Sequence, residues 1–119
     1  MENAKAKTQK ETASFEKKKK IDLRIGTIIE AEKMPKANKL LVLRVDTGID
    51  VRTIVSGIAE HFTPEEVIGK RVTVLVNLAP RALRGVESEG MLLLTNNAEG
   101  KLVFVNPDAE GVINGAMIS

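Results

Sequence analysis

With 119 residues the chain has room for one domain, and its 43% hydrophobic content is typical of a globular protein whose core Ile, Leu and Val must fill, because only three residues are aromatic. The absence of cysteine excludes disulfides, thiolate zinc sites and a thiol nucleophile. No apolar run is long enough for a secretory signal or a membrane span, so we expect a soluble, cytoplasmic protein without a membrane partner.

The basic charge lies in the first twenty residues. Seven Lys and three Glu give residues 1–20 a net charge of +4, and the total of +2 leaves −2 for residues 21–119. The first segment has little apolar surface to offset the entropy cost of ordering. We therefore predict a disordered basic leader or fraying helix over residues 1–20, with Phe15 as its one anchor, and a folded domain over residues 21–119. A basic surface on that domain requires local clustering of its eleven Lys and Arg.

Three strands are predicted in the first half of the domain. Apolar and polar residues alternate over residues 21–29, where Gly26 indicates a bulge or bend inside one long strand. A loop over residues 34–39 separates this strand from a second, equally alternating one over residues 41–46. Residues 51–55 form the third strand.

A short helix and two further strands follow. Thr63, Pro64 and Glu66 have the pattern of a capping box at a helix start, and Gly69 marks the end of that helix. Alternating residues 72–77 and the apolar run 91–95 predict strands four and five.

This order of elements is that of an all-β OB-fold, a five-stranded barrel that commonly binds oligonucleotides on one face and its loops. Residues 102–105 and 112–118 lie beyond the five strands that make up the barrel. We predict that they form a C-terminal extension of added strands that cap the barrel or pair with another subunit.

The loop between the first two strands is the first candidate site. Lys33, Lys36 and Lys39 place three ammonium groups within seven residues, and Asn38 lies among them. Cations in this loop of an OB-fold border the ligand face, and phosphates bound there give an affinity that falls with salt. A solvated Lys-rich loop without a ligand is the alternative.

The segment over residues 77–91 is the second and more informative candidate. Arg81 and Arg84 are three residues apart and would present two guanidinium forks to phosphate oxygens. Ser88 adds a hydroxyl, whereas Met91 fits core packing as well as ligand contact. The segment Val55-Ser56-Gly57-Ile58-Ala59, a strand end with a small turn, is a weaker third candidate.

Several segments together resemble one known family. They are Asp22-Leu23-Arg24-Ile25-Gly26, Ala37-Asn38-Lys39-Leu40, Ser56-Gly57-Ile58, Asn77-Leu78-Ala79-Pro80-Arg81, Arg84-Gly85, Ser88-Glu89-Gly90-Met91 and Pro107-Asp108, in that family's order. The family is the tRNA-binding domain found at the C-terminus of many bacterial methionyl-tRNA synthetases and in related stand-alone tRNA-binding proteins. The resemblance covers about residues 21–118.

The resemblance implies a non-catalytic module that dimerises through its C-terminal extension and grips the outer corner of L-shaped tRNA, with Ser88 and Met91 as contacts. The leader would fit the linker that joins such a module to a synthetase body. Asn38 stands where relatives often have Asp, which removes a negative charge beside Lys39. We expect no catalytic residue, metal, cofactor or small-molecule substrate.

Two other functions stay open. CsaA-type secretion chaperones share the fold and would bind unfolded polypeptide; residues 61–70 resemble that branch too, although it usually lacks the Ser-Gly-Ile turn and the Gly-Met pair present here. An enzyme is disfavoured, because His61 has no Ser, Cys or His partner at a useful spacing and Glu87 and Glu89 have no general-base partner.

The scarcity of aromatic residues determines the expected mode of binding. Stacking of single-stranded bases on aromatic rings, at roughly 1–3 kcal/mol per base, cannot dominate here, so recognition should be by shape. We predict phosphate contacts for the cations, neutral hydrogen bonds for the amide and the hydroxyl, and packing of the thioether on a sugar or an exposed base. The cations are Lys33, Lys36, Lys39, Arg81 and Arg84. The amide is that of Asn38, the hydroxyl that of Ser88 and the thioether that of Met91.

Overall fold

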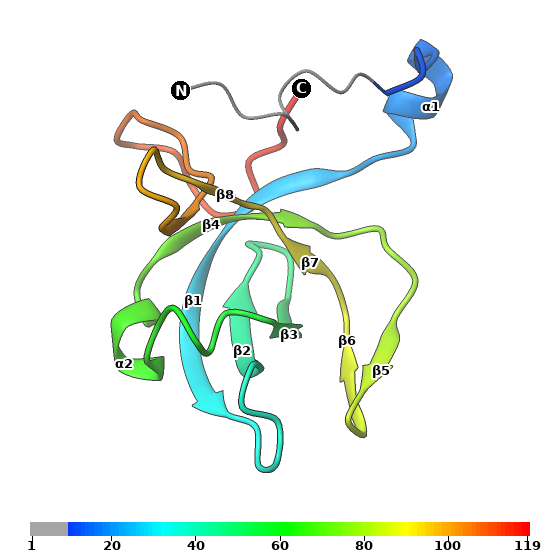
Figure 1. Ribbon diagram of the computed structural model, residues 1–119. Coiled ribbons are helices and arrows are strands. Elements are labelled where there is room, and N and C mark those ends of the chain that lie inside the picture. The colour runs from blue at the N-terminus through cyan, green and yellow to red at the C-terminus, as the bar shows by residue number, and fades with distance from the viewer. Residues whose placement is uncertain (1–9) are drawn as a thin grey trace.

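The computed structural model describes residues 10–119 as a curled sheet with short helices and hairpins around it (Figure 1). The elements are α1 Phe15–Lys19, β1 Leu23–Lys33, β2 Leu41–Asp46, β3 Val51–Ser56, α2 Pro64–Val67, β4 Arg71–Leu75, β5 Arg81–Leu83, β6 Val86–Ser88, β7 Met91–Leu92, β8 Leu94–Asn96 and β9 Leu102–Phe104. The part of the predicted leader over residues 1–9 lies outside the described residues.

The main sheet has the strand order β3-β2-β1-β4-β7, and every neighbouring pair is antiparallel. β1 organises it, because its first half pairs with β4 and its second half with β2. The strands curl around one face, and α2 lies at the side of the curl (Figure 1). The predicted all-β OB-fold, with five strands and a short helix between the third and the fourth, is confirmed.

The long first strand with an internal irregularity is also confirmed, although its position differs from the expected one. The pairing with β2 shifts between Ile28 and Glu30, so the irregularity lies at Ile29, three residues after Gly26. Gly26 instead permits close packing, since a Cβ at this position would lie 2.9 Å from both the Asp46 carbonyl oxygen and Val45 Cγ1.

Aliphatic side chains from the inner face of the sheet and from α2 fill the core, as the composition predicts. The fully buried members are Ile28, Leu41, Leu43, Val45, Ile54, Val67, Val72 and Val74. Burying one such side chain contributes about 1.5–3 kcal/mol. Phe62 and Phe104 stack with ring centroids 5.1 Å apart, so two of the three aromatic residues pack against this cluster as a pair.

The predicted capping box of the short helix is present. The Thr63 hydroxyl accepts from the Glu66 N–H, and the Glu66 carboxylate accepts from the Thr63 N–H at 2.8 Å. Pro64 occupies the first turn, and Gly69 beyond the helix has φ +89°, the left-handed conformation of a helix stop.

The region after β4 differs most from the prediction. Residues 81–88, expected in a loop, form the hairpin β5–β6, in which Leu83 pairs with Val86 around a two-residue turn. The fifth strand is divided: β7 joins the main sheet, whereas β8 leaves it and pairs with β9. β9 confirms the strand predicted over residues 102–105.

The last segment, over residues 112–118, was predicted as a strand, but within the described residues 10–119 it makes only one isolated bridge, between Arg24 and Met117. It still follows the start of β1, because Gly115 and Ile118 donate backbone hydrogen bonds to Ile25 and Leu23 at 2.8 and 2.9 Å. A C-terminal extension therefore covers one end of β1 without forming a regular strand.

The described part of the leader contains α1, which begins after Ser14 as N-cap. Phe15 is 77% exposed and does not act as the predicted anchor. The attachment is polar instead and lies at Lys20, described below. None of the helices in residues 10–119 is long and apolar enough to cross a membrane.

Candidate nucleic-acid interface

The two candidate segments lie at the same end of the barrel. The β1–β2 loop and the tip of the β5–β6 hairpin are both at the lower end in Figure 1, and α1 lies at the opposite end. A second apolar cluster joins them, with residues from the loop, the hairpin and the strands beneath. Its buried members are Met34, Ala37 and Val55, and Leu40, Val42, Leu83 and Val86 pack against them. Folding therefore fixes the two segments relative to each other.

The β1–β2 loop folds so that its apolar residues point inward and its cations outward. Met34 and Ala37 are buried, whereas Lys36 and Lys39 are exposed. Backbone hydrogen bonds close the loop, from the Ala37 N–H to the Met34 carbonyl at 3.2 Å and from the Leu40 N–H to the Ala37 carbonyl at 3.0 Å. Its side chains are thus presented from an ordered backbone.

The hairpin presents its two guanidinium groups in different ways. Arg81 is exposed on β5, whereas Arg84 occupies the turn with φ 51°, followed by Gly85 with φ 83°. Two consecutive positive φ angles in a two-residue loop are the mark of a type I′ turn, whose twist matches that of the flanking strands. Arg84 therefore extends from the tip of the hairpin.

Cations from both segments border one groove of about 480 Å³, which we call the lysine groove. Its lining consists of Lys36, Ala37, Asn38, Lys39, Leu40 and Arg84. Lys36, with φ 62°, and Arg84 are the two non-glycine residues with positive φ in residues 10–119. Lys33 lies nearby at the end of β1 and is exposed.

The candidate cations have no ion-pair partner among residues 10–119. The ion pairs between side chains of residues 10–119 are Arg24–Asp22 and Arg52–Asp50, which involve none of them. Lys33, Lys36, Lys39, Arg81 and Arg84 are all exposed. A local excess of positive charge therefore exists on a domain that carries −2 in total over residues 21–119.

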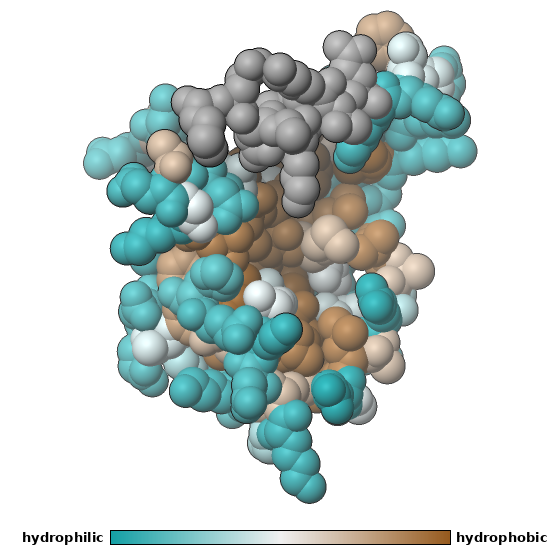
Figure 2. Space-filling model, in the orientation of Figure 1, coloured by the Kyte–Doolittle hydropathy of each residue, from teal (hydrophilic) through white to brown (hydrophobic). Residues whose placement is uncertain are grey.

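A second groove of about 250 Å³, which we call the Met91 groove, continues the surface. It is lined by Val55, Ser56, Gly57, Leu78, Ala79, Arg81, Leu83, Ser88, Gly90, Met91 and Leu92. Met91 is 48% exposed, whereas the next residue, Leu92, points into the core. Strand alternation thus turns the thioether toward solvent and makes it available for a ligand. Figure 2 shows apolar residues gathered in the middle of the face that it displays and hydrophilic residues at its lower end.

Ser88 has a different role from the expected ligand contact. It is 5% exposed, and its hydroxyl accepts from the Val55 N–H at 3.0 Å and donates to the Gly90 carbonyl at 3.1 Å. The hydroxyl thus accepts one hydrogen bond and donates another within the protein. Ser88 thus fixes the floor of the Met91 groove instead of pointing out of it.

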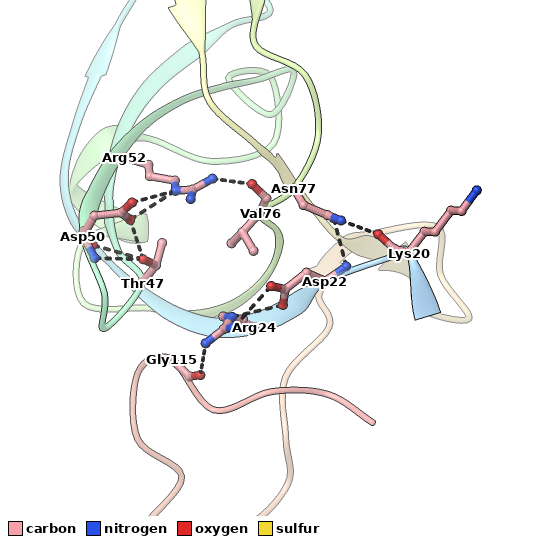
Figure 3. A network of polar contacts seen from close by, with 9 residues as sticks. All are labelled: Lys20, Asp22, Arg24, Thr47, Asp50, Arg52, Val76, Asn77 and Gly115. Atoms are coloured by element: carbon pink, nitrogen blue, oxygen red, sulfur yellow. Dashed lines mark hydrogen bonds and ion pairs between the residues drawn. The ribbon is translucent and has the colours of Figure 1, made fainter. Parts of the chain in front are cut away.

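Arg52 is a residue of this region that the sequence did not single out. Its guanidinium donates to the Asp50 carboxylate and to the Val76 carbonyl (Figure 3). It also donates to the Glu89 carbonyl at 3.1 Å. Glu89 also accepts from the Thr53 N–H at 3.0 Å and donates its own N–H to the Thr53 carbonyl at 2.8 Å. Both ends of the segment over residues 77–91 are thereby attached to β3.

The Asp50 carboxylate is held in its charged form. Thr47 donates its hydroxyl to Asp50 Oδ1 at 2.6 Å, and this bond, followed by the bond and the charge of Arg52, lowers the pKa of Asp50 below its ordinary value. The one sequence signal for this pair is the spacing: Asp50 and Arg52 are two residues apart where a strand begins. Residues two apart in a strand point to the same face of the sheet.

Asn77 connects the leader to the same segment. Its amide oxygen accepts from the Asp22 N–H at 2.9 Å, and its Nδ2 donates to the Lys20 carbonyl (Figure 3). The chain enters β1 at this point. Asn77 therefore holds the end of the basic leader beside the start of the segment that carries Arg81.

Comparison with known proteins adds an independent line of evidence. Residues 23–116 match the family model described as "Putative tRNA binding domain". The chain is 75% identical over 118 residues to a protein of Flavobacterium johnsoniae and 70% identical over 119 residues to one of Christiangramia forsetii, each named "Methionine--tRNA ligase". These alignments include 99% and 100% of this chain, which spans 16% and 17% of the two relatives.

Solved structures are similar over most of the chain. A MetRS related protein from Pyrococcus horikoshii superposes with a TM-score of 0.82 and 39% identity, covering 92% of this chain and all of the other. The chaperone CsaA from Bacillus anthracis gives a TM-score of 0.79 and 32% identity, with 92% of this chain and all of the other covered. The C-terminal domain of Plasmodium vivax p43 gives 0.76 and 32%, with 84% of this chain and 60% of the other covered.

Proposed function

Because the chain belongs to the tRNA-binding domain family, we propose that it is the non-catalytic part of a methionine–tRNA ligase that binds the folded body of tRNA. The observation that carries this proposal is the shared end of the barrel, where cations of the β1–β2 loop and of the β5–β6 hairpin border one groove. Phosphate contacts of this kind position a protein on RNA without reading its sequence.

The roles of the individual residues follow from their exposure. Exposed Lys and Arg side chains bind backbone phosphates, the exposed Asn38 amide adds a neutral hydrogen bond, and Met91 packs against a sugar or a base. Ser88 supports the groove from below. The cations in this assignment are Lys33, Lys36, Lys39, Arg81 and Arg84.

In a ligase the module would act as a tether. A module that holds any tRNA body raises the effective concentration of tRNA near the catalytic site, while the catalytic part selects the correct tRNA. The proposal also places the module in the cytoplasm, together with the catalytic part of the ligase. The chain has 16% of the length of the F. johnsoniae ligase, so the chemistry would reside in the remainder.

Homodimerisation through the C-terminal extension is part of the proposal. Large apolar side chains of that segment are exposed, with Ile113 at 74% and Met117 at 67%, and Ile49 beside them at 62%. A two-fold interface over these residues would remove apolar surface from water and present two cationic ends to RNA.

Binding of total tRNA over a salt series tests the proposed function. We expect the double variant Arg81→Ala with Arg84→Ala to weaken binding of several unrelated tRNAs alike and to lower the salt slope by about 1–2, because each lost phosphate contact removes about 0.7–0.9 from it. The matched control is Lys70→Ala with Lys101→Ala, which removes the same charge from residues that line neither groove. Loss confined to one tRNA, or an equal effect of the control, would contradict the proposal.

A polypeptide-binding chaperone is the second candidate, favoured by the likeness to CsaA and by the apolar lining of the Met91 groove. It predicts that an unfolded peptide binds at physiological salt and that tRNA does not. The same titration, run with both ligands, distinguishes the two functions.

A further inference from the structure

Gly57 borders the Met91 groove without any requirement of the fold for glycine. Its φ is not among the positive values, so a side chain would not strain the backbone. A Cβ at this position would approach no atom more closely than the Lys39 carbonyl oxygen at 4.0 Å, which is ordinary contact distance. The glycine thus leaves open space beside the groove that a side chain would occupy.

Gly90, on the floor of the same groove, shows the contrast. A Cβ there would lie 3.0 Å from the Leu75 carbonyl oxygen and 3.4 Å from Ile54 Cδ1, so the packing of the barrel explains this glycine. Packing does not explain Gly57. A ligand that occupies this space would explain the glycine.

The walls of the groove combine apolar faces with a few polar groups. Leu78 and Met91 are exposed by 41% and 48%, and Arg81 stands at the rim. The Ser56 hydroxyl, also in the lining, has no hydrogen-bond partner within residues 10–119. A planar group that is apolar on its faces, polar at its edge and linked to an anion would match each of these features.

We propose that the Met91 groove takes one unstacked base of the bound tRNA. The base lies against Met91 and Leu78 over Gly57, its edge or ribose hydroxyl meets the Ser56 hydroxyl, and the adjoining phosphate binds Arg81. The inference rests on the proposed function and deepens it, since it gives the contact proposed for Met91 a defined pocket for one base.

The size of the groove supports a single base. Its volume of about 250 Å³ is below the ~300–1,000 Å³ of sites for drug-sized ligands. An apolar peptide side chain could also enter, but the exposed cations beside the groove favour an anionic chain over a neutral one.

Filling the space at Gly57 tests the inference. We expect Gly57→Leu to weaken tRNA binding about tenfold without changing the salt slope, because it displaces a base and removes no phosphate contact. Arg81→Ala should instead lower the slope by about 1. Ala98→Leu, at an exposed turn position between β8 and β9, is the matched control for added bulk and should bind as the parent does. Thermal unfolding is measured for all variants.

A titration of the unaltered chain with the four nucleoside 5′-monophosphates keeps the test independent of folding of the variants. We expect the amide NMR signals of Gly57 and Gly90 to shift, and those of Ala98 to stay. Full tRNA affinity in a folded Gly57→Leu variant would overturn the inference. It would also be overturned if these signals shifted with an unfolded leucine-rich peptide and not with the nucleotides.

The two proposals fail separately. If the Arg81 and Arg84 double variant loses affinity and Gly57→Leu does not, phosphate binding stands and the base site is wrong. If the parent chain does not bind tRNA, the proposed function is wrong.

Discussion

Arg52 donates to acceptors in three different parts of the chain, namely Asp50, Val76 and Glu89. A guanidinium can do this because it holds five donors in a rigid plane, which a lysine ammonium does not. Arg52 therefore supports the Met91 groove from outside its lining, as Ser88 does from within it. Residues that build this interface and residues that face the ligand are thus different sets.

The Asp50 carboxylate gives the stability of the fold an acid dependence that can be measured. Its pKa is lowered in the folded state, so the charged form contributes stability above the ordinary value of 3.8, and that contribution is lost as the pH falls through the lower folded-state pKa. We expect Asp50→Asn to reduce the free energy of unfolding at pH 7 by about 0.5 kcal/mol, because the 45% exposed side chain is screened by solvent.

Thermal unfolding of Asp50→Asn and of the parent from pH 7 to pH 2 checks this. The difference between the two proteins should shrink below pH 4. Glu66, whose pKa is also lowered by its capping hydrogen bonds, is present in both proteins and cancels in the difference. Asp108→Asn, at an exposed carboxylate without a hydrogen bond in residues 10–119, should have no such effect. A difference that stays constant with pH would rule out the carboxylate as the cause.

At the scale of elements, the β5–β6 hairpin determines where two of the candidate cations stand. Its strands have three residues each, and Leu83 and Val86 attach it to the same apolar cluster as the β1–β2 loop. The left-handed conformation of Arg84 is one that asparagine adopts readily and most other residues do not.

Arg84→Asn is therefore a substitution that separates charge from backbone conformation. We expect the free energy of unfolding to stay equal or to rise by about 0.5 kcal/mol, because asparagine fits the turn better. Binding of tRNA should weaken, and its salt slope should fall by about 0.7–0.9. Urea unfolding and a salt series of binding titrations measure both effects. A loss of more than about 1 kcal/mol of stability would mean that the turn differs in solution.

Regular elements could be predicted from the sequence wherever burial alternates or a cap is complete. β2 has the predicted bounds, Leu41–Asp46, and the helix at Thr63 has its capping box. The hairpin was missed because Arg84-Gly85 lacks the Asn-Gly signal of a type I′ turn and strands this short are held by tertiary packing.

The sequence predicted which residues belong to the candidate site, but not how their side chains are oriented. The sequence indicated which residues carry charge near the ligand face of an OB-fold. It could not indicate that the Ser88 hydroxyl turns inward, since a serine between two glutamates fits either orientation. Nor could it identify Arg52, whose role depends on carbonyls from other segments, or show that Gly57, part of the weaker candidate turn, lies beside open space.

At the scale of the whole molecule, the C-terminal segment packs against the turn between β2 and β3. Gly48 in this turn has φ +86°, and a Cβ there would lie 2.3 Å from the Asn114 carbonyl oxygen. Asn114 is in turn fixed by the Thr27 hydroxyl, which donates to its Oδ1 at 2.8 Å. The extension and the barrel therefore share one packed contact.

Gly48→Ala should displace the extension. We expect a loss of more than about 2 kcal/mol in the free energy of unfolding, from left-handed strain together with the clash, and a shift of any dimer toward monomer in sedimentation. Gly100→Ala is the matched control, because Gly100 has φ +81° but open space around it. It should cost about 1 kcal/mol and leave assembly unchanged. Equal losses in the two variants would exclude the packing contact as the cause.

The apolar cluster beneath the β1–β2 loop and the β5–β6 hairpin has a consequence for kinetics. Because Met34, Ala37 and Val55 hold the two segments in place before RNA arrives, docking requires little rearrangement of the protein. Encounter should then be limited by diffusion and accelerated by long-range attraction, with rate constants above the ~10⁵–10⁷ M⁻¹s⁻¹ of unsteered partners.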